Sequence, residues 1–150
     1  MRKFFSLAII AAAWPVVAAA QPAPVPGNRP SHPEEVALVD EGAKGFVYRR
    51  FPGGERLYTF ARDGVRRSAC NQGCEGGWPP VPAPADATTI GRWSVVVRYD
   101  GSRQWALDGR PVYTRFHDSP EQPVGDGFHG VWHVVPYTPA RDGVPTPAAP

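Results

Sequence analysis

Two cysteines, Cys70 and Cys74, are the residues whose type and spacing point most directly to chemistry. Three residues separate them, and the amino terminus described below indicates export, so the sequence predicts a disulfide between them. Because the loop is short, that bond would shape the turn more than stabilise the domain. The alternative is a redox or electron-transfer site holding copper or haem through both thiolates and a histidine. The usual redox and haem-attachment patterns have two intervening residues, which favours the disulfide.

Two histidines, His129 and His133, have a spacing that would suit a metal ion only on a helix. The segment 130–135 has the pattern of a strand, in which the two rings would lie about 13 Å apart at roughly 3.3 Å per residue. We therefore expect surface or structural histidines and no resident metal. Both histidines remain, with the two cysteines, the alternative metal-ligating set.

Two aspartates, Asp63 and Asp118, occupy equivalent positions of an internal repeat, 55 residues apart. A pseudo-symmetric fold could bring them together as carboxylates that share a proton. Each also follows a predicted strand and precedes Gly or Ser-Pro, where an aspartate typically caps a turn, and this is the stronger interpretation. Neither Ser68 nor Ser102 has the context of an activated nucleophile, so the sequence predicts no catalytic residue and no enzyme.

Large aromatic residues recur at matching positions of the repeat and are most simply explained as core. Burial in a small β domain is dominated by such side chains. An exposed subset could instead line a cleft for a flat ligand, a glycan or a peptide, and the sequence leaves both interpretations open. The residues concerned are Tyr58, Trp78, Trp93, Trp105, Tyr113 and Trp132.

The elements that must position these residues are predicted to be strands. Pro52-Gly53-Gly54 is typical of a hairpin turn, and Asp100-Gly101 and Asp108-Gly109 flank a further strand. No window has apolar residues at helical spacing over more than two turns. The sequence predicts an all-β domain over 35–138, in which two similar hairpin-plus-loop repeats, about 45–80 and about 98–136, pack into one small antiparallel domain. The predicted strands are 36–39, 46–50, 56–60, 92–99, 103–107, 111–116 and 131–135.

With these motifs in order, the chain resembles the bacterial secreted-repeat proteins, often labelled predicted lipoproteins. Their motif is a tyrosine, one residue, an aromatic, two residues and an aspartate, as in Tyr58 to Asp63. The second copy departs from it, because Arg115 stands where an aromatic is expected. The resemblance covers about 45–136 and implies an exported β protein without an assigned reaction. The matching residues are Tyr58, Phe60, Asp63, Trp78, Pro79, Pro80, Asp100, Gly101, Gln104, Trp105, Tyr113, Asp118 and Trp132.

The flanks are predicted to lie outside the domain. Residues 1–20 have the basic start, apolar run and small-residue end of a cleaved signal peptide, and no membrane span is expected. No cysteine lies near the cleavage point, so no lipid anchor is expected. The segments 21–34 and 139–150 are proline-rich and are predicted to be disordered. Loss of Arg2 and Lys3 leaves 14 basic and 14 acidic residues, a balance that excludes a strongly basic nucleic-acid-binding protein.

Taken as a whole, the sequence predicts a non-enzymatic periplasmic or secreted protein that binds an envelope protein or a small ligand. The unusual residues are concentrated in two loops, Cys70 to Trp78 and Gly125 to Trp132. Loops carried on a rigid β scaffold are where binding residues tend to lie. The alternative is the copper or haem accessory described above.

Overall fold

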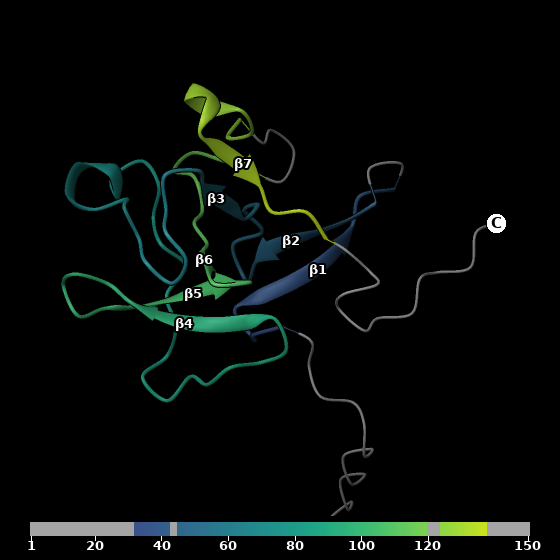
Figure 1. The fold of residues 1–150 in the computed structure, drawn as a ribbon. Coiled ribbons are helices and arrows are strands. Elements are labelled where there is room, and N and C mark those ends of the chain that lie inside the picture. Colours follow the sequence, from purple (N-terminus) through teal and green to yellow (C-terminus); the bar gives the residue numbers. More distant parts are fainter. Residues whose placement is uncertain (1–31, 43–44, 120–123, 138–150) are drawn as a thin grey trace, which may run out of the picture.

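The computed structural model describes residues 32–42, 45–119 and 124–137. Its regular structure is almost all strand, which confirms the predicted all-β class (Figure 1). The predicted signal peptide, the C-terminal tail and most of the proline-rich linker lie outside the described residues. The strands are β1 (Val36–Asp40), β2 (Phe46–Arg50), β3 (Tyr58–Phe60), β4 (Trp93–Val97), β5 (Arg103–Leu107), β6 (Arg110–Pro111) and β7 (Trp132–Val134), with 3-10 turns η2 (Gln72–Cys74) and η3 (Phe128–Gly130).

Each half of the domain begins with an antiparallel hairpin, and the two hairpins have the same register. In the first, β1 pairs with β2 so that Val36 lies opposite Arg50. In the second, β4 pairs with β5 so that Trp93 lies opposite Leu107, an offset of 57 residues at both ends of the ladder. The internal repeat of the sequence is therefore also a repeat of strand pairing.

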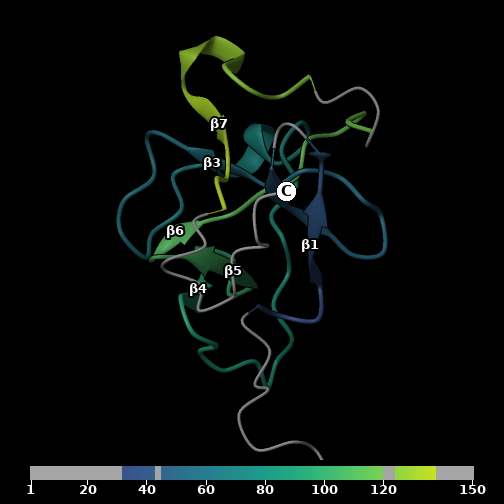
Figure 2. The ribbon, with the colours of Figure 1, turned by 90° about the vertical axis from the view of Figure 1, so that its right-hand side faces the viewer.

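The two halves are joined through β3 and β7, which pair with each other although Tyr58 and Val134 are far apart in the chain. The predicted hairpin 46–60 is only partly present, because β3 pairs with β7 and not with β2. Beyond the turn, the Arg50 amide donates to the Glu55 carbonyl (2.8 Å) and the Leu57 amide donates to the Tyr48 carbonyl (3.2 Å), beside a bridge between Arg49 and Arg56. The chain then leaves β2 and runs to the last strand. Figure 2 shows β3 and β7 together above β4, β5 and β6.

The strand β4 changes its buried face along its length, contrary to the alternation expected for 92–99. Trp93 is buried, but Val97 and Tyr99 on the same predicted face are 64% and 62% exposed. The buried residues at this end are Val96 and Arg98. The reason is that hydrogen-bond partners surround the Arg98 guanidinium, so its burial is compensated and the apolar side chains turn outward.

The core consists of two apolar clusters that each draw on both repeats. The larger cluster lies between the two hairpins, where Tyr48 meets Trp93 edge to face with ring centroids 5.2 Å apart. The smaller contains the tyrosines and tryptophans of the repeat motif and lies beneath two loops, 61–78 and 118–131, which we call the first and second excursion loops. Neither repeat can bury its apolar face without the other. The members of the smaller cluster are Tyr58, Phe60, Cys70, Trp78, Tyr113 and Trp132.

Candidate functional site

The centre of the site is a reciprocal contact between the two motif tyrosines. The backbone amide of Tyr58 donates to the carbonyl of Tyr113, and the amide of Tyr113 donates back to Tyr58, both at 2.9 Å. The Tyr58 hydroxyl donates to Asp118 (2.6 Å), and the Tyr113 hydroxyl donates to Asp63 (2.9 Å). Each tyrosine thus binds the aspartate of the other repeat.

The proposed shared-proton pair of Asp63 and Asp118 is not formed in the part of the chain that the structure describes. Each carboxylate instead accepts a tyrosine hydroxyl and one backbone amide, from Ala69 and Val124 respectively, both at 2.7 Å. These amides lie within the two excursion loops, so the aspartates hold the loops in place, as the turn-capping interpretation anticipated. The physical reason is that the tyrosines stand between the repeats.

Burial shapes the protonation of these groups. Burial raises the pKa of the Tyr113 hydroxyl, and it raises the pKa of Tyr58, with the neighbouring Asp118 adding to the effect. Burial also raises the pKa of Asp63, against the lowering effect of the Ala69 amide and the Tyr113 hydroxyl. The two phenols therefore stay protonated as donors at neutral pH, which suits a structural role.

Above the tyrosines lies a stack of flat side chains that alternates between the repeats. The rings of Trp78 and Trp132 are parallel, with centroids 3.8 Å apart and an interplanar angle of 2°. Phe60 stacks on Trp132 at 4.4 Å, and the Arg115 guanidinium lies over Trp78 at 4.9 Å from its centroid. Arg115 therefore does for the second repeat what Phe60 does for the first, through a cation-π contact in place of an aromatic one.

Cys70 and Cys74 form the predicted disulfide, with Cα atoms 5.3 Å apart. The loop they close is also held from β4, because Arg98 donates to the Cys70 carbonyl (2.6 Å) and forms an ion pair with Glu75. The same guanidinium donates to Gln104, whose own amide donates to the Val112 carbonyl (2.8 Å). A buried arginine thus ties the disulfide loop to the second repeat.

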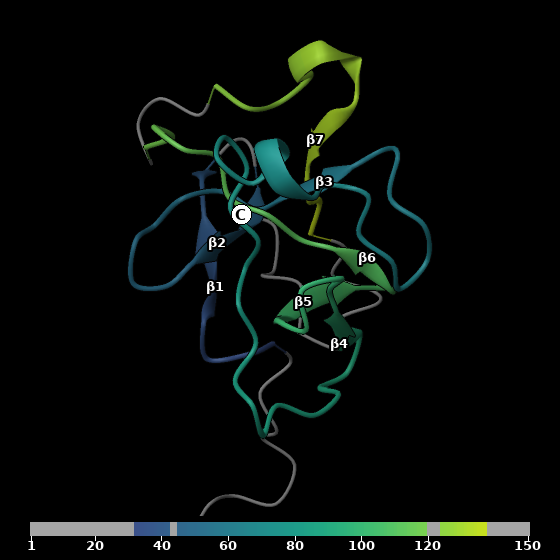
Figure 3. The ribbon, with the colours of Figure 1, turned by 90° about the vertical axis from the view of Figure 1, so that its left-hand side faces the viewer.

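A cleft of about 350 Å³ opens where the two excursion loops meet. The turns η2 and η3 lie at the same end of the molecule in all three views (Figure 3). Trp78 and Phe128 are in contact there, with centroids 5.7 Å apart. The two loops singled out in the sequence therefore meet, each contributing to one cleft. Its lining residues are Gly73, Cys74, Gly77, Trp78, Arg115, Phe116, His117 and Phe128.

The sequence pattern missed the three consecutive residues Arg115, Phe116 and His117, which supply one wall of this cleft. Phe116 is 59% exposed. Arg115 also lies over the Phe128 ring, with its guanidinium carbon 4.0 Å from the centroid. Its Nε is buried without a hydrogen-bond partner, and no acidic side chain pairs with it among the described residues. The departure from the repeat motif at Arg115 was the one signal in the sequence.

The histidines singled out earlier occupy different elements. His133 is exposed on β7, and His129 lies in η3 with a positive φ of 49°. Over 32–42, 45–119 and 124–137, no cluster of three or more His, Cys, Asp or Glu side chains is placed to hold a metal ion. The disulfide occupies both sulfurs in this structure. The copper or haem alternative, which needs free thiolates, stays a prediction.

The remaining motif residues lie in turns and in the core. Asp100 accepts hydrogen bonds from the amide and hydroxyl of Ser102 (2.9 and 2.7 Å), and Gly101 has a positive φ of 82°, so this pair forms the β4 to β5 turn. The Pro79 carbonyl accepts from the Thr114 amide (2.9 Å). Trp105 is buried and donates through its indole to Glu35 (3.1 Å). Pro80 bridges to Tyr113.

Comparison with known proteins bears on the second repeat. Residues 94–136 match the model of a family described as a secreted repeat of unknown function. This segment is similar to the family's repeat. The family resemblance drawn from the motifs is thereby confirmed, and the matched residues run from β4 to just beyond β7, which is one hairpin with its excursion and closing strand. No curated protein and no solved structure matches the chain. No helix in the described residues is long and apolar enough to cross a membrane.

Proposed function

We propose that this protein is a non-enzymatic, exported binding module whose ligand occupies the cleft between the two excursion loops. The ligand class is a carboxylate carried next to an apolar group. The observation that carries the proposal is Arg115, a half-buried cation stacked on Trp78 and Phe128 with an unsatisfied Nε and no acidic partner in the described residues.

The chemistry of the cleft wall supports this ligand class. An arginine presents a fork of N–H donors that matches a carboxylate, and a half-buried cation gains most from an anion that also excludes water. The exposed Phe116 and the ring of Phe128 offer apolar surface beside that cation. A ligand with only a charge or only an apolar group would use one half of the site.

The cleft is also rigidly supported. The disulfide and Arg98 hold the first loop, and the Trp78 ring, which lines the cleft, stacks on the buried Trp132 ring of β7. A preformed site spends less free energy on ordering when a ligand binds. This rigidity accords with a binding role, which needs neither a nucleophile nor a proton donor.

Export is the second part of the proposal. We expect cleavage after Ala20 and a periplasmic or secreted protein. Native mass spectrometry of the exported protein should give the mass of residues 21–150 less two hydrogens. A retained copper ion or haem, with both thiols free, would instead favour the electron-transfer alternative.

An NMR titration tests the cleft, with N-acetylphenylalanine as the probe and its uncharged amide as the matched control. The carboxylate should shift the indole N–H signal of Trp78 with a millimolar Kd, and the amide should bind at least about tenfold more weakly, or about 1.4 kcal/mol. Arg115→Phe restores the aromatic of the family motif, so it should keep the fold and lose the preference for the carboxylate.

Arg62→Phe is the control variant, because Arg62 is exposed and lies on the first excursion outside this cleft. It should bind the carboxylate as the native protein does. Equal binding of the carboxylate and the amide to the native protein, or an unchanged preference in Arg115→Phe, would remove the basis of the proposal.

A further inference from the structure

A second site lies along the first excursion, at residues that take no part in the cleft. Two adjoining hollows of about 500 and 280 Å³ share Arg67, Ser68 and Asn71 as lining residues. None of the residues that line them lines the cleft at Trp78 and Phe128. We call the two hollows together the arginine groove. Its residues are Arg62, Gly64, Arg66, Arg67, Ser68, Ala69, Asn71, Val97, Arg98 and Tyr99.

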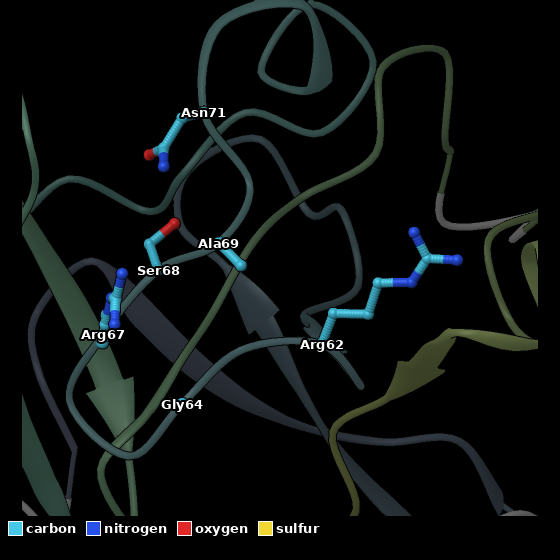
Figure 4. A pocket seen from close by; sticks show the side chains of 6 residues that line it. All are labelled: Arg62, Gly64, Arg67, Ser68, Ala69 and Asn71. Carbon is cyan, nitrogen blue, oxygen red and sulfur yellow. The ribbon is translucent and has the colours of Figure 1, made fainter.

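The groove carries positive charge that its surroundings do not neutralise. Arg66 and Arg67 are exposed, and neither has a hydrogen bond or ion pair from its side chain within the described residues. The buried Arg98 is different, because Glu75 pairs with it. Figure 4 shows Arg67 on the same side of the loop as Ser68 and Asn71, whereas the Arg62 side chain extends away from them. Two cations, Arg66 and Arg67, therefore remain to meet a ligand.

The backbone holds these two arginines in a fixed turn. The amide of Gly64 donates to the carbonyl of Arg67 (3.0 Å) and the amide of Arg67 donates back (3.2 Å), which closes a tight reversal. Arg66 lies in it with a positive φ of 57°, a conformation that is uncommon for a residue with a side chain. Its amide donates to the Gly109 carbonyl (2.6 Å), so the second repeat fixes the turn.

The rest of the groove wall combines hydrogen-bonding groups with an exposed ring. Tyr99 is 62% exposed and Val97 is 64% exposed, which gives a flat apolar surface beside the cations. Asn71 uses its carbonyl oxygen as an acceptor for Arg98 (3.4 Å), so its side-chain amide remains as a donor. The Ser68 hydroxyl is already engaged by Tyr113 and Arg98, and it serves the scaffold.

We infer that the arginine groove binds an acidic saccharide, a sugar chain that carries carboxylates. Arg66 and Arg67 would meet the carboxylate, the Asn71 amide would donate to a ring hydroxyl, and the Tyr99 ring would cover an apolar sugar face. The argument for a sugar over a simple anion is the ring of Tyr99, since a small anion would use only the arginines. The argument against a nucleic acid is the balanced charge of the exported chain and the small number of cations.

The test is a calorimetric and NMR titration of the full exported chain with trigalacturonic acid, a trisaccharide with three carboxylates. Binding should weaken with added salt, because Arg66 and Arg67 are exposed. Arg67→Ala and Tyr99→Ala should each weaken binding by about tenfold. Arg50→Ala removes the same charge from β2, outside both hollows, so it should change the affinity by less than about twofold.

Four outcomes would overturn the inference. They are binding of the neutral trisaccharide maltotriose as tight as that of the acidic one, binding of inorganic phosphate as tight as that of the saccharide, an effect of Arg50→Ala as large as that of Arg67→Ala, and tighter binding of a single-stranded oligonucleotide. The Arg115→Phe variant should leave saccharide binding unchanged. Failure of this inference can therefore be distinguished from failure of the proposed cleft ligand.

Discussion

At the scale of single residues, the family motif is explained by an exchange of partners between the repeats. A tyrosine and an aspartate five residues later do not bind each other; each binds its counterpart across the interface, Tyr58 to Asp118 and Tyr113 to Asp63. Gly125 also belongs to this arrangement, because a Cβ there would lie 2.5 Å from the Tyr58 ring. These two tyrosines and two aspartates therefore form the join between the repeats.

Removal of one of these hydroxyls should destabilise the domain. Tyr113→Phe keeps the buried ring but removes the hydroxyl that donates to Asp63, so we expect a loss of about 1.5–3 kcal/mol in the free energy of unfolding. Urea denaturation measures this. The exposed Tyr99→Phe serves as the control and should stay within about 0.5 kcal/mol of the native protein. An equal effect of both variants would contradict the structural role of Tyr113.

The carboxylate of Glu41 should make stability depend on pH. Burial acts to raise its pKa, but the hydrogen bonds and charges of Arg49 and Arg56 outweigh this, so the pKa lies below its usual 4.5. Because the folded pKa is depressed, the stabilising contribution is complete above about pH 4.5 and is lost as the pH falls through the folded pKa.

Glu41→Gln should therefore lower the free energy of unfolding by roughly 1–2 kcal/mol at neutral pH, since it leaves the half-buried Arg49 and Arg56 without their carboxylate. The difference from the native protein should shrink below pH 4.5, measured by urea denaturation across pH. The exposed Asp86→Asn is the control, and it should cost little at any pH. A difference that stays constant down to pH 3 would contradict this account.

At the scale of elements, the first excursion lacks strand ladders and is held by two different links. The disulfide closes a short loop, and the buried Arg98 ties the same loop to β4 and β5. The entropy model gives a five-residue loop about 2 kcal/mol. Breaking a buried charge network typically costs about 3–5 kcal/mol. The guanidinium should thus be the stronger of the two links.

This ordering can be checked by comparing two variants. Arg98→Met leaves Glu75 and the Cys70 carbonyl without their partner. It should lower the free energy of unfolding more than the double change Cys70→Ala with Cys74→Ala does. Chemical denaturation gives both values, with the exposed Arg62→Met as a control for loss of charge. If the cysteine pair proved the costlier to remove, the disulfide and not Arg98 would be the main link.

At the scale of the whole molecule, the domain is two similar halves that complete each other. The hairpins β1–β2 and β4–β5 share one register, β3 finds its partner in β7, and the Trp78 and Trp132 rings stack face to face. An isolated two-stranded hairpin is at best marginally stable in water. Each half therefore depends on the other for its core.

We expect the halves to fold only together. Separate chains of residues 32–92 and 93–137 should each lack dispersed NMR signals, because β3 and β7 have lost their pairing. An equimolar mixture should regain the dispersion of the full-length control. A half that gives a folded spectrum alone would show that the repeat, and not the pair, is the stable unit.

By itself the sequence determined the features that depend on local chemistry. Turn residues such as Asp100-Gly101 and the alternation of apolar residues gave the all-β class, and the spacing of Cys70 and Cys74 gave the disulfide. The repeated motif gave the family, which the match over 94–136 confirms. These features are written in residue types and spacings along the chain, so a sequence pattern is enough to predict them.

Tertiary structure alone decided which residues meet across the repeats. Nothing local to Tyr58 indicates that its hydroxyl will bind Asp118, 60 residues later, or that Arg115 will take the stacking place of an aromatic on Trp78. The outward turn of Tyr99 depends likewise on the partners that bury Arg98. Such contacts are set by packing between distant segments, where a cation can replace a ring and a carboxylate can find a partner far along the chain.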